Sequence, residues 1–277
     1  MPSLYTKKNM KHISLNNSNP VIGIFDSGLG GLTILNQLNQ DFNNSQFIYF
    51  GDTAHLPYGT KSHKSIIRFC DNIVDFLISK GANIIVIACH SASAVALDYL
   101  KKKYSIPILG VIKPSIIHAL QSTTKNSICV LGTSTTINSH TYRDHIKQLS
   151  DKIEIYEIAC PLFVPIVEEG LEDSEIATLA TRMYLDQISS IPIDTLILGC
   201  THYPILLNKI KETINNNIQI INTGSSISIA LSNIVTNSEN ISNTSTQYYV
   251  SDLPYRFNDL ASKFLNSPID HVQQISL

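Results

Sequence analysis

Short runs of apolar, mostly β-branched residues recur along the chain from Pro20 onward. Each run is bounded by Gly, Asp or Asn, and its apolar side chains stand at consecutive rather than alternating positions. Strands that are covered on both faces have this pattern, which is typical of parallel sheets. We therefore predict buried parallel strands at residues 21–25, 47–50, 84–87, 127–131, 153–158, 196–198 and 218–221.

Amphipathic stretches separate these predicted strands. The clearest covers residues 66–78, where apolar side chains recur at the spacing of a helix, and it stops before Gly81, a typical residue just beyond a helix end. We predict further helices at 32–38, 175–188 and 204–214. Strands that alternate with helices predict an α/β fold with parallel sheets.

The pattern also contains a weak internal repeat. In each half, an apolar strand ends on a cysteine (Cys89 or Cys200), and an earlier strand is followed by a polar residue (Asp26 or Thr133). Two similar halves predict two pseudo-symmetric α/β domains: residues 20–113 plus 224–277 form the first and 114–223 the second, after a weakly ordered extension at 1–19. Ligands of open α/β sheets bind outside the carboxyl ends of the strands, so both cysteines should border one cleft between the domains.

Composition and charge favour a small-molecule substrate. The chain has 277 residues, of which 43% are hydrophobic and 15% charged, and its net charge at pH 7 is −2. No block of like charge is present to attract nucleic acid or an anionic membrane. Since the sequence shows neither a signal peptide nor an apolar run of about 18 residues, we expect a cytoplasmic protein.

The five cysteines are odd in number and include no Cys-x-x-Cys pair, which argues against a disulfide framework and against a zinc site. Most free cysteines are small buried residues, and we interpret Cys70, Cys129 and Cys160 in this way. Cys89 and Cys200 differ because each stands at a strand end, ahead of hydroxyl and imidazole side chains. A helix N-terminus and a nearby histidine can lower a thiol pKa below its usual ~8.5, so we expect these two thiols to be functional.

Two thiols suit a reaction that inverts a stereocentre. One group removes the proton from one face of the carbon, and the other returns a proton to the opposite face, without the substrate moving. Such groups work best when their pKa lies near the working pH. Carbanion-like charge can be stabilised by backbone N–H groups and by exclusion of water, so we expect no cofactor and no metal.

A glycine-rich turn follows the first predicted strand, in the segment Asp26-Ser27-Gly28-Leu29-Gly30-Gly31. Glycines let the backbone approach a ligand closely, and the following helix N-terminus offers N–H groups to an anion. A P-loop is excluded because no Gly-Lys-Ser/Thr follows, and the spacing G-x-G-x-x-G is not met. Asp26 is either a helix N-cap or a group that holds a substrate ammonium or polarises a neighbouring thiol.

Two further segments leave alternatives open. The Leu-Pro-Tyr-Gly segment at 56–59 is either a turn or part of the cleft. Residues 163–170 end an apolar run with the paired carboxylates Glu168 and Glu169, which are either a surface pair at a helix end or part of the cleft.

Taken together, the ordered motifs resemble the glutamate racemases of the aspartate/glutamate racemase superfamily. They extend from about residue 20 to about residue 225, and they are Asp26 to Gly31, Gly51-Asp52-Thr53-Ala54, Pro57-Tyr58-Gly59, Ala88-Cys89, Leu131-Gly132-Thr133, residues 160–165 and residues 198–204. Each motif alone is weak, whereas the ordered set is highly specific. The resemblance implies two α/β domains with the active site between them, and a C-terminal tail that completes the first domain by adding a helix.

The resemblance also implies roles for individual residues. Cys89 and Cys200 would be the catalytic acid/base pair, with support from Asp26, His202 and, near His202, Glu168. The predicted substrate-binding residues are Asp26, Ser27, Pro57, Tyr58, Gly59, His90, Ser91, Thr133, Thr136, Thr201 and His202. The family departs from this chain at one point: where its members usually have Asn then Thr after the first cysteine, this chain has His90 then Ser91. A histidine there can add a charge when protonated, alter substrate choice or change the pKa of Cys89.

The family is independent of cofactors and commonly forms homodimers, and its D-glutamate feeds peptidoglycan synthesis, cell-wall biogenesis and the maintenance of cell shape. The N-terminal extension resembles one in Gram-negative members that a peptidoglycan precursor activates, so such an activator is a further expectation. Two alternatives stay open: a racemase of aspartate or another small amino acid, and a non-catalytic anion-binding relative. Loss of racemisation in both Cys89→Ser and Cys200→Ser would separate an enzyme from a binding protein.

Overall fold

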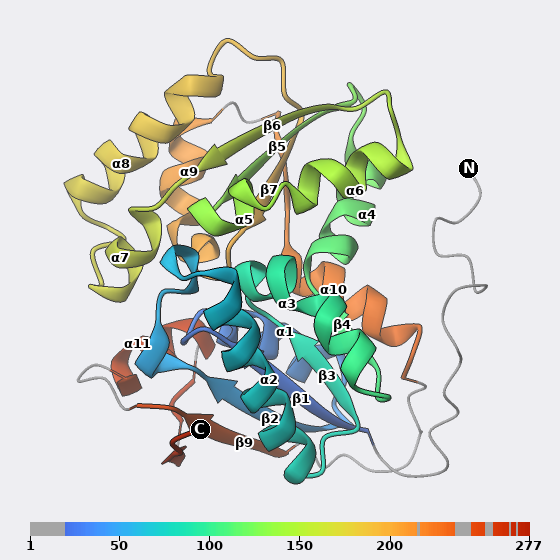
Figure 1. The fold of residues 1–277 in the computed structure, drawn as a ribbon. Helices are drawn as coiled ribbons and strands as arrows, with labels where there is room; N and C mark the ends of the chain where they lie inside the picture. The colour runs from blue at the N-terminus through green and yellow to red at the C-terminus, as the bar shows by residue number, and fades with distance from the viewer. Residues whose placement is uncertain (1–19, 215–216, 236–244, 253–256, 266, 270) are drawn as a thin grey trace.

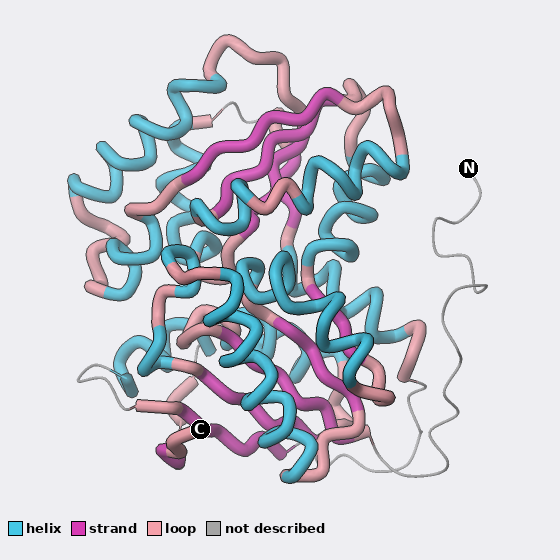
Figure 2. The backbone as a smooth tube through the Cα atoms, in the orientation of Figure 1, coloured by secondary structure: helices cyan, strands magenta, loops and turns pink. Residues whose placement is uncertain are grey.

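The computed structural model describes residues 20–214, 217–235, 245–252, 257–265, 267–269 and 271–277. These residues form two parallel β-sheets in separate halves of the molecule, with helices packed around each (Figures 1 and 2). The predicted α/β class with parallel sheets is therefore confirmed. The extension predicted at residues 1–19 lies outside the described residues. Within the described residues, none of the helices combines the length and the apolar character needed to cross a membrane.

The first sheet has six strands in the order β10-β9-β2-β1-β3-β4. Its strands are β1 (Val21–Asp26), β2 (Gln46–Gly51), β3 (Ile84–Ile87), β4 (Ile108–Gly110), β9 (Ser245–Val250) and β10 (Val272–Gln274). Every neighbouring pair is parallel. The carboxyl ends of β1 and β3 therefore meet at one edge of the sheet.

The second sheet has four strands in the order β6-β5-β7-β8, again all parallel. Its strands are β5 (Ser127–Gly132), β6 (Glu154–Ala159), β7 (Thr195–Gly199) and β8 (Gln219–Ile221). The chain passes to this sheet after β4 and returns to the first sheet after β8. This order agrees with the predicted two-part organisation, whose boundaries at 113/114 and 223/224 stay a prediction.

Helices cover both faces of each sheet, which explains the continuous apolar runs. They are α1 (Leu32–Asp41), α2 (His63–Ser79), α3 (His90–Lys103), α4 (Ile112–Ser122), α5 (Ser134–Asn138), α6 (Thr141–Leu149), α7 (Phe163–Glu168), α8 (Glu175–Leu185), α9 (Leu207–Thr213), α10 (Thr223–Ser232) and α11 (Phe257–Leu265). In β1, Ile24 packs in the same cluster as residues of α1 and α11, whereas its neighbour Phe25 packs with α2 and α3. Alternate side chains of one strand thus enter different cores, and each is removed from water.

The local signals for helix ends agree with the structure at α2. This helix ends at Ser79, and Gly81 adopts a φ of +98°, a backbone conformation that favours glycine. The C-terminal tail contributes more than the predicted helix: besides α11, it adds β9 and β10 to the edge of the first sheet. The expectation of a helix alone was incomplete because β9, next to the edge strand β10, begins with polar, partly exposed residues rather than with the continuous apolar run of the central strands.

Candidate active site

The two cysteines singled out in the sequence lie at the ends of strands from different sheets. Cys89 follows β3 and stands at the N-terminus of α3, and Cys200 follows β7 directly. Their exposed fractions are 6% and 7%, and both line one cavity of about 280 Å³. The sheets therefore bring the two thiols to a shared cleft, as the strand-end positions predicted.

Cys89 is surrounded by groups that keep its sulfur protonated. Burial and the charge of Asp26 raise the pKa of the Cys89 thiol to about 12, although backbone N–H groups of α3 and the Ser27 hydroxyl act in the opposite direction. The Sγ atom lies 3.6 Å from Ser27 Oγ. The expectation that the helix N-terminus depresses this pKa was wrong, because removal of the sulfur from water outweighs the helix.

Cys200 stands beside a buried imidazole that is itself paired. His202 Nδ1 lies 3.9 Å from Cys200 Sγ, and its Nε2 lies 2.5 Å from Glu168 Oε1. Burial alone would lower the pKa of His202, but its hydrogen bonds to Cys200 and Glu168 and their charges raise it well above the usual value. The ring thus carries positive charge next to Cys200. Of the two interpretations of Glu168, the structure supports a place at the cleft, since α7 ends there and only 19% of this side chain is exposed.

Asp26 connects the two halves of the site. Its carboxylate is fully buried and accepts hydrogen bonds from Gly28 N (3.1 Å) and from Thr201 Oγ1 (3.2 Å), a residue that follows the other sheet. Burial raises the pKa of Asp26 against the lowering effects of His202 and of these hydrogen bonds. The N-cap alternative was wrong: α1 begins at Leu32 after Gly31 and has no side-chain cap.

The glycine-rich turn allows the second half of the molecule to approach. A methyl group on Gly30 would lie 2.6 Å from His202 Nδ1, closer than real side chains come to such an atom. Gly30 is therefore required for the close approach of the loop that carries Cys200 and His202. The close contact explains the turn without a bound phosphate.

A group of hydroxyls forms another part of the wall. Ser91 Oγ lies 2.9 Å from Thr133 Oγ1 and 3.3 Å from Thr136 Oγ1, and the two threonine hydroxyls are 3.1 Å apart. Ser91 and Thr133 line the cavity, whereas Thr136 is fully buried behind them and does not. This contact joins α3 to the start of α5, so it also crosses between the sheets.

The segment at 56–59 lies at the cavity rather than forming only a turn. Pro57, Tyr58 and Gly59 line it, and the Leu56–Pro57 peptide bond is cis. The buried Tyr58 hydroxyl donates to Asp52 Oδ2 at 2.5 Å, and burial raises its pKa well above the usual value. A methyl group on Gly59 would lie 2.8 Å from Thr133 Cβ, so this glycine permits contact with the second sheet.

Sequence reasoning gave no role to Asp52, which holds this segment in place. It accepts hydrogen bonds from Tyr58, from His55 Nδ1 at 2.8 Å and from Ser251 Oγ at 2.7 Å. The available signal was an acidic residue directly after β2. Val164 of α7 also lines the cavity and was not predicted as a site residue.

His90 lies in the wall of the cavity and is only 2% exposed. Its Nε2 is 3.5 Å from Thr223 Oγ1, and its Nδ1 has no hydrogen-bond partner among the described residues. Burial lowers the pKa of His90 to about 3, so the ring is neutral at ordinary pH. The expectation that His90 can add a positive charge was therefore wrong.

No three His, Cys, Asp or Glu side chains within the parts of the chain that the structure describes are placed to hold a metal ion. The site thus consists of two thiols from different sheets, a carboxylate, an imidazole–carboxylate pair and several hydroxyls. These groups can move protons and bind a small polar molecule.

Comparison with known proteins identifies the family to which this chain belongs. The family model described as Asp/Glu/Hydantoin racemase matches residues 20–227, which include β1 to β4 of the first sheet, all of the second sheet and both thiols. The chain belongs to the Asp/Glu/Hydantoin racemase family. As a racemase it is an isomerase, the enzyme class that two opposed thiols predicted.

Individual relatives agree with this assignment. The racemase is 41% identical over 260 residues to a glutamate racemase of Geobacter metallireducens, covering 92% of this chain and 96% of the relative. A crystal structure of a glutamate racemase isoform from Bacillus anthracis superposes with a TM-score of 0.89 at 33% identity, over 93% of this chain and 98% of that one. The structure from Francisella tularensis, described as a complex with D-glutamate, has a TM-score of 0.85 at 35% identity, over 93% of this chain and 98% of its own.

Proposed function

We propose that this racemase interconverts L- and D-glutamate with Cys89 and Cys200 as two separate acid/base groups, one of which removes the α-proton while the other delivers a different proton to the opposite face. The observation that carries the proposal is that two thiols from different sheets line one cavity. Glutamate is the substrate named for the Geobacter and Bacillus relatives, and D-glutamate is the ligand named for the Francisella structure.

The groups around each thiol determine which sulfur begins as the acid and which as the base. One sulfur, as a thiolate, takes the α-proton and leaves the electron pair on Cα, and the other sulfur donates its proton to the opposite face. Cys89 begins as the acid, because its raised pKa keeps the proton on sulfur. Cys200 begins as the base, because the His202 ring offers positive charge 3.9 Å from its sulfur. The opposite direction uses the opposite assignment.

The remaining wall residues bind and orient the substrate in this proposal. Hydroxyls of Ser27, Ser91, Thr133 and Thr201 offer hydrogen bonds to its two carboxylates. Asp26 does not line the cavity; it is buried behind Thr201, whose hydroxyl donates to it at 3.2 Å, and from there its negative charge acts on the substrate ammonium group. Pro57, Tyr58, Gly59 and His90 shape the wall, and Thr136 positions Thr133 from behind.

The decisive experiment is to incubate the pure protein with L-glutamate in deuterated water without added cofactor. Circular dichroism follows the loss of the L form, and mass spectrometry of the separated enantiomers follows deuterium at Cα. Two separate thiols predict deuterium in newly formed D-glutamate, while early recovered L-glutamate keeps its proton. Equal labelling of both enantiomers from the start would point to a single exchanging group and contradict the two-thiol mechanism.

Cysteine variants test the assignment of residues. Cys89→Ser and Cys200→Ser should each lose nearly all racemisation, because a serine hydroxyl is a far weaker acid than a thiol. Cys160→Ser is a matched control: this cysteine is fully buried, and its sulfur donates a hydrogen bond to the Ile158 carbonyl at 3.7 Å, which a hydroxyl can also do. Full activity in either of the first two variants would refute the proposal.

The substrate alternatives are tested in the same assay. Aspartate replaces glutamate, and the ratio of kcat/KM values decides between the two amino acids. If neither is racemised while glutamate still binds, the non-catalytic relative becomes the better interpretation. Structures described as an aspartate racemase and its homologue are only 18% and 16% identical, so they show the fold alone.

We further propose that the enzyme acts in the cytoplasm as a homodimer and supplies D-glutamate for peptidoglycan. Support for a dimer comes from one face of α8, where Ile176, Leu179 and Met183 are 56%, 57% and 52% exposed. Leu179→Glu should shift the mass measured by light scattering to that of a monomer, whereas Leu149→Glu, at another exposed leucine on α6, should not. A dimer that survives Leu179→Glu would exclude this face.

The proposed activation by a peptidoglycan precursor is tested by adding UDP-N-acetylmuramoyl-L-alanine to the assay. An activator of this kind is named for the Escherichia coli structure, which is 21% identical and supports only the fold. A rise in kcat or a fall in KM supports activation, and unchanged kinetics contradict it.

A further inference from the structure

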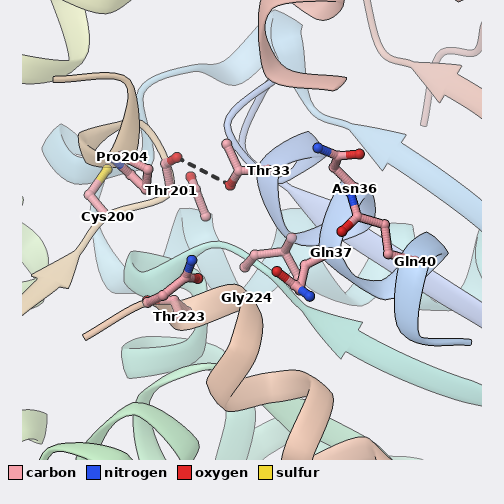
Figure 3. Close-up of a pocket in the computed structure, with 11 residues that line it drawn as sticks. Thr33, Asn36, Gln37, Gln40, Cys200, Thr201, Pro204, Thr223 and Gly224 are labelled. Carbon is pink, nitrogen blue, oxygen red and sulfur yellow. Dashed lines mark hydrogen bonds between the residues drawn. The ribbon is translucent and has the colours of Figure 1, made fainter. Parts of the chain in front are cut away.

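A second cavity, with about 170 Å³ of space inside it, borders the loop that carries Cys200. Its walls come from one face of α1 and from the N-terminal end of α10, as Figure 3 shows. Cys200 and Thr201 line both this cavity, here called the α1–α10 pocket, and the active-site cavity. The two cavities therefore share one wall, and that wall contains a proposed catalytic thiol.

The α1–α10 pocket is lined mainly by uncharged polar side chains. Thr33, Asn36, Gln37 and Gln40 recur on α1 at three- and four-residue spacing, so they share one face of the helix. They oppose Asn222, Thr223 and Gly224, and the one charge in the lining is the thiolate that the proposed mechanism places on Cys200. A carboxylate or phosphate in this pocket would lose hydration beside that thiolate without gaining a side-chain cation.

Several of these side chains have hydrogen-bonding capacity left over. Within the part of the chain that the structure describes, the amides of Asn36 and Gln40 make no hydrogen bond, and both face the pocket. The Gln37 amide nitrogen donates to Asp41 Oδ2 at 2.9 Å, which leaves its carbonyl oxygen available. Asp41 also brings a negative charge close to this end of α1. Adjacent donors and acceptors without charge match the hydroxyl or amide groups of a neutral molecule.

One contact links the pocket to the catalytic loop. Thr33 Oγ1 lies 3.5 Å from the Thr201 carbonyl oxygen, shown as a dashed line in Figure 3, and it also donates to the Gly30 carbonyl at 2.8 Å. A hydroxyl has a single proton, so these two acceptors compete for it. Thr201 in turn donates to Asp26. A ligand that engages Thr33 therefore acts directly on the loop between Cys200 and His202.

We propose that the α1–α10 pocket is a regulatory site for a small uncharged ligand with adjacent hydroxyl or amide groups, and that its occupancy changes the rate of racemisation through the loop at Thr201. The effect on rate rests on the proposed function, whereas binding to the pocket does not. The space of about 170 Å³ limits the ligand to a molecule no larger than a monosaccharide.

Glucose and N-acetylglucosamine are suitable neutral probes, with glucose 1-phosphate as the charged counterpart. Ligand-observed NMR on the full chain measures binding and needs no enzymatic turnover. We expect saturable binding of at least one neutral sugar and weaker binding of the phosphate. The double variant Asn36→Leu/Gln40→Leu should weaken binding about tenfold or more through two lost hydrogen bonds. Gln148→Leu, at an exposed position of α6, is the matched control and should bind like the unchanged protein.

Racemisation kinetics supply the second readout. At saturating glutamate the bound sugar should change kcat, and this change should disappear in the double variant. Competition with glutamate would instead make the pocket part of the substrate route and would overturn regulation. Failure of both neutral sugars to saturate, binding that survives the double variant, or tighter binding of the phosphate would overturn the site itself. If the protein binds a sugar in this pocket but racemises neither amino acid, the binding site is supported and only the proposed function is refuted.

Discussion

Replacement of Glu168 by glutamine tests whether charge on His202 matters for the reaction. The carboxylate lies 2.5 Å from His202 Nε2, and the two side chains are 19% and 2% exposed. Hydrogen bonds to charged groups contribute about 1.5–3 kcal/mol. Glutamine keeps an acceptor oxygen but loses the charge, so the lower end of this range applies. We therefore expect kcat/KM to fall about tenfold, since 1.4 kcal/mol corresponds to a factor of ten.

The assay should follow both directions of the reaction across pH. Enantiomers have equal free energies, so kcat/KM for the L and D forms must fall by the same factor, which checks the data internally. Glu169→Gln is the control, because it removes the same charge from the exposed neighbouring position. Unchanged kcat/KM in Glu168→Gln, or an equal loss in Glu169→Gln, would refute the reasoning.

The pH dependence of the free energy of unfolding tests the charge on His202 independently of the kinetics. The pKa of His202 is raised in the folded protein, so its interactions contribute stability that is fully present below its unfolded pKa of about 6.5. That contribution is lost as the pH rises through the raised value. Urea unfolding should therefore show the largest difference between the unchanged protein and Glu168→Gln near pH 6, and a smaller one at high pH. A difference that grows with pH would contradict a charged His202.

Three further changes test other parts of the site. Gly30→Ala should lower kcat at least tenfold, because the added methyl group would lie 2.6 Å from His202 Nδ1, while the secondary structure seen by circular dichroism should persist. Normal turnover would show that the loop moves freely. His90→Leu should raise KM for glutamate about tenfold. His90→Asn should retain most activity, because asparagine keeps a neutral donor and acceptor at this position of the cavity wall. Equal kinetics in the two variants would show that the His90 ring does not contribute to substrate binding. Asp52→Asn should lower the free energy of unfolding by about 1–3 kcal/mol and reduce kcat/KM, because this carboxylate accepts three hydrogen bonds. An unchanged urea midpoint and unchanged kinetics would show that Asp52 does not hold the segment at 56–59 in place.

Much of the fold was predictable because its central strands are buried on both faces. Continuous apolar runs marked β1, β3, β5 and β7, and helical spacing marked α2 up to the glycine that follows it. Short strands at or near the sheet edges were not predicted. The strands β9 and β10 lie at or near one end of the sheet order and are only partly covered, so their apolar pattern is weak. The edge strand β4 is fully buried, but its three residues are too few to form a recognisable apolar run.

The candidate site was only partly predictable. The position of a residue at the end of a parallel strand is a property of the chain, so Cys89 and Cys200 could each be placed at the carboxyl edge of a sheet from the sequence. The direction of a pKa shift is not such a property, because it depends on burial and on charges from distant segments. Cys89 lies next to a helix N-terminus in sequence, yet burial and Asp26 raise its pKa.

The sequence by itself thus determined the fold class, the two thiols and the family that their motifs resemble. Only the tertiary structure decided that Glu168 pairs with His202 rather than facing solvent, that Asp52 holds Tyr58, and that His90 stays neutral. It also placed the amide-lined pocket next to Cys200. Local patterns fix which residues end a strand, whereas the environment of a side chain is set by segments that only folding brings together.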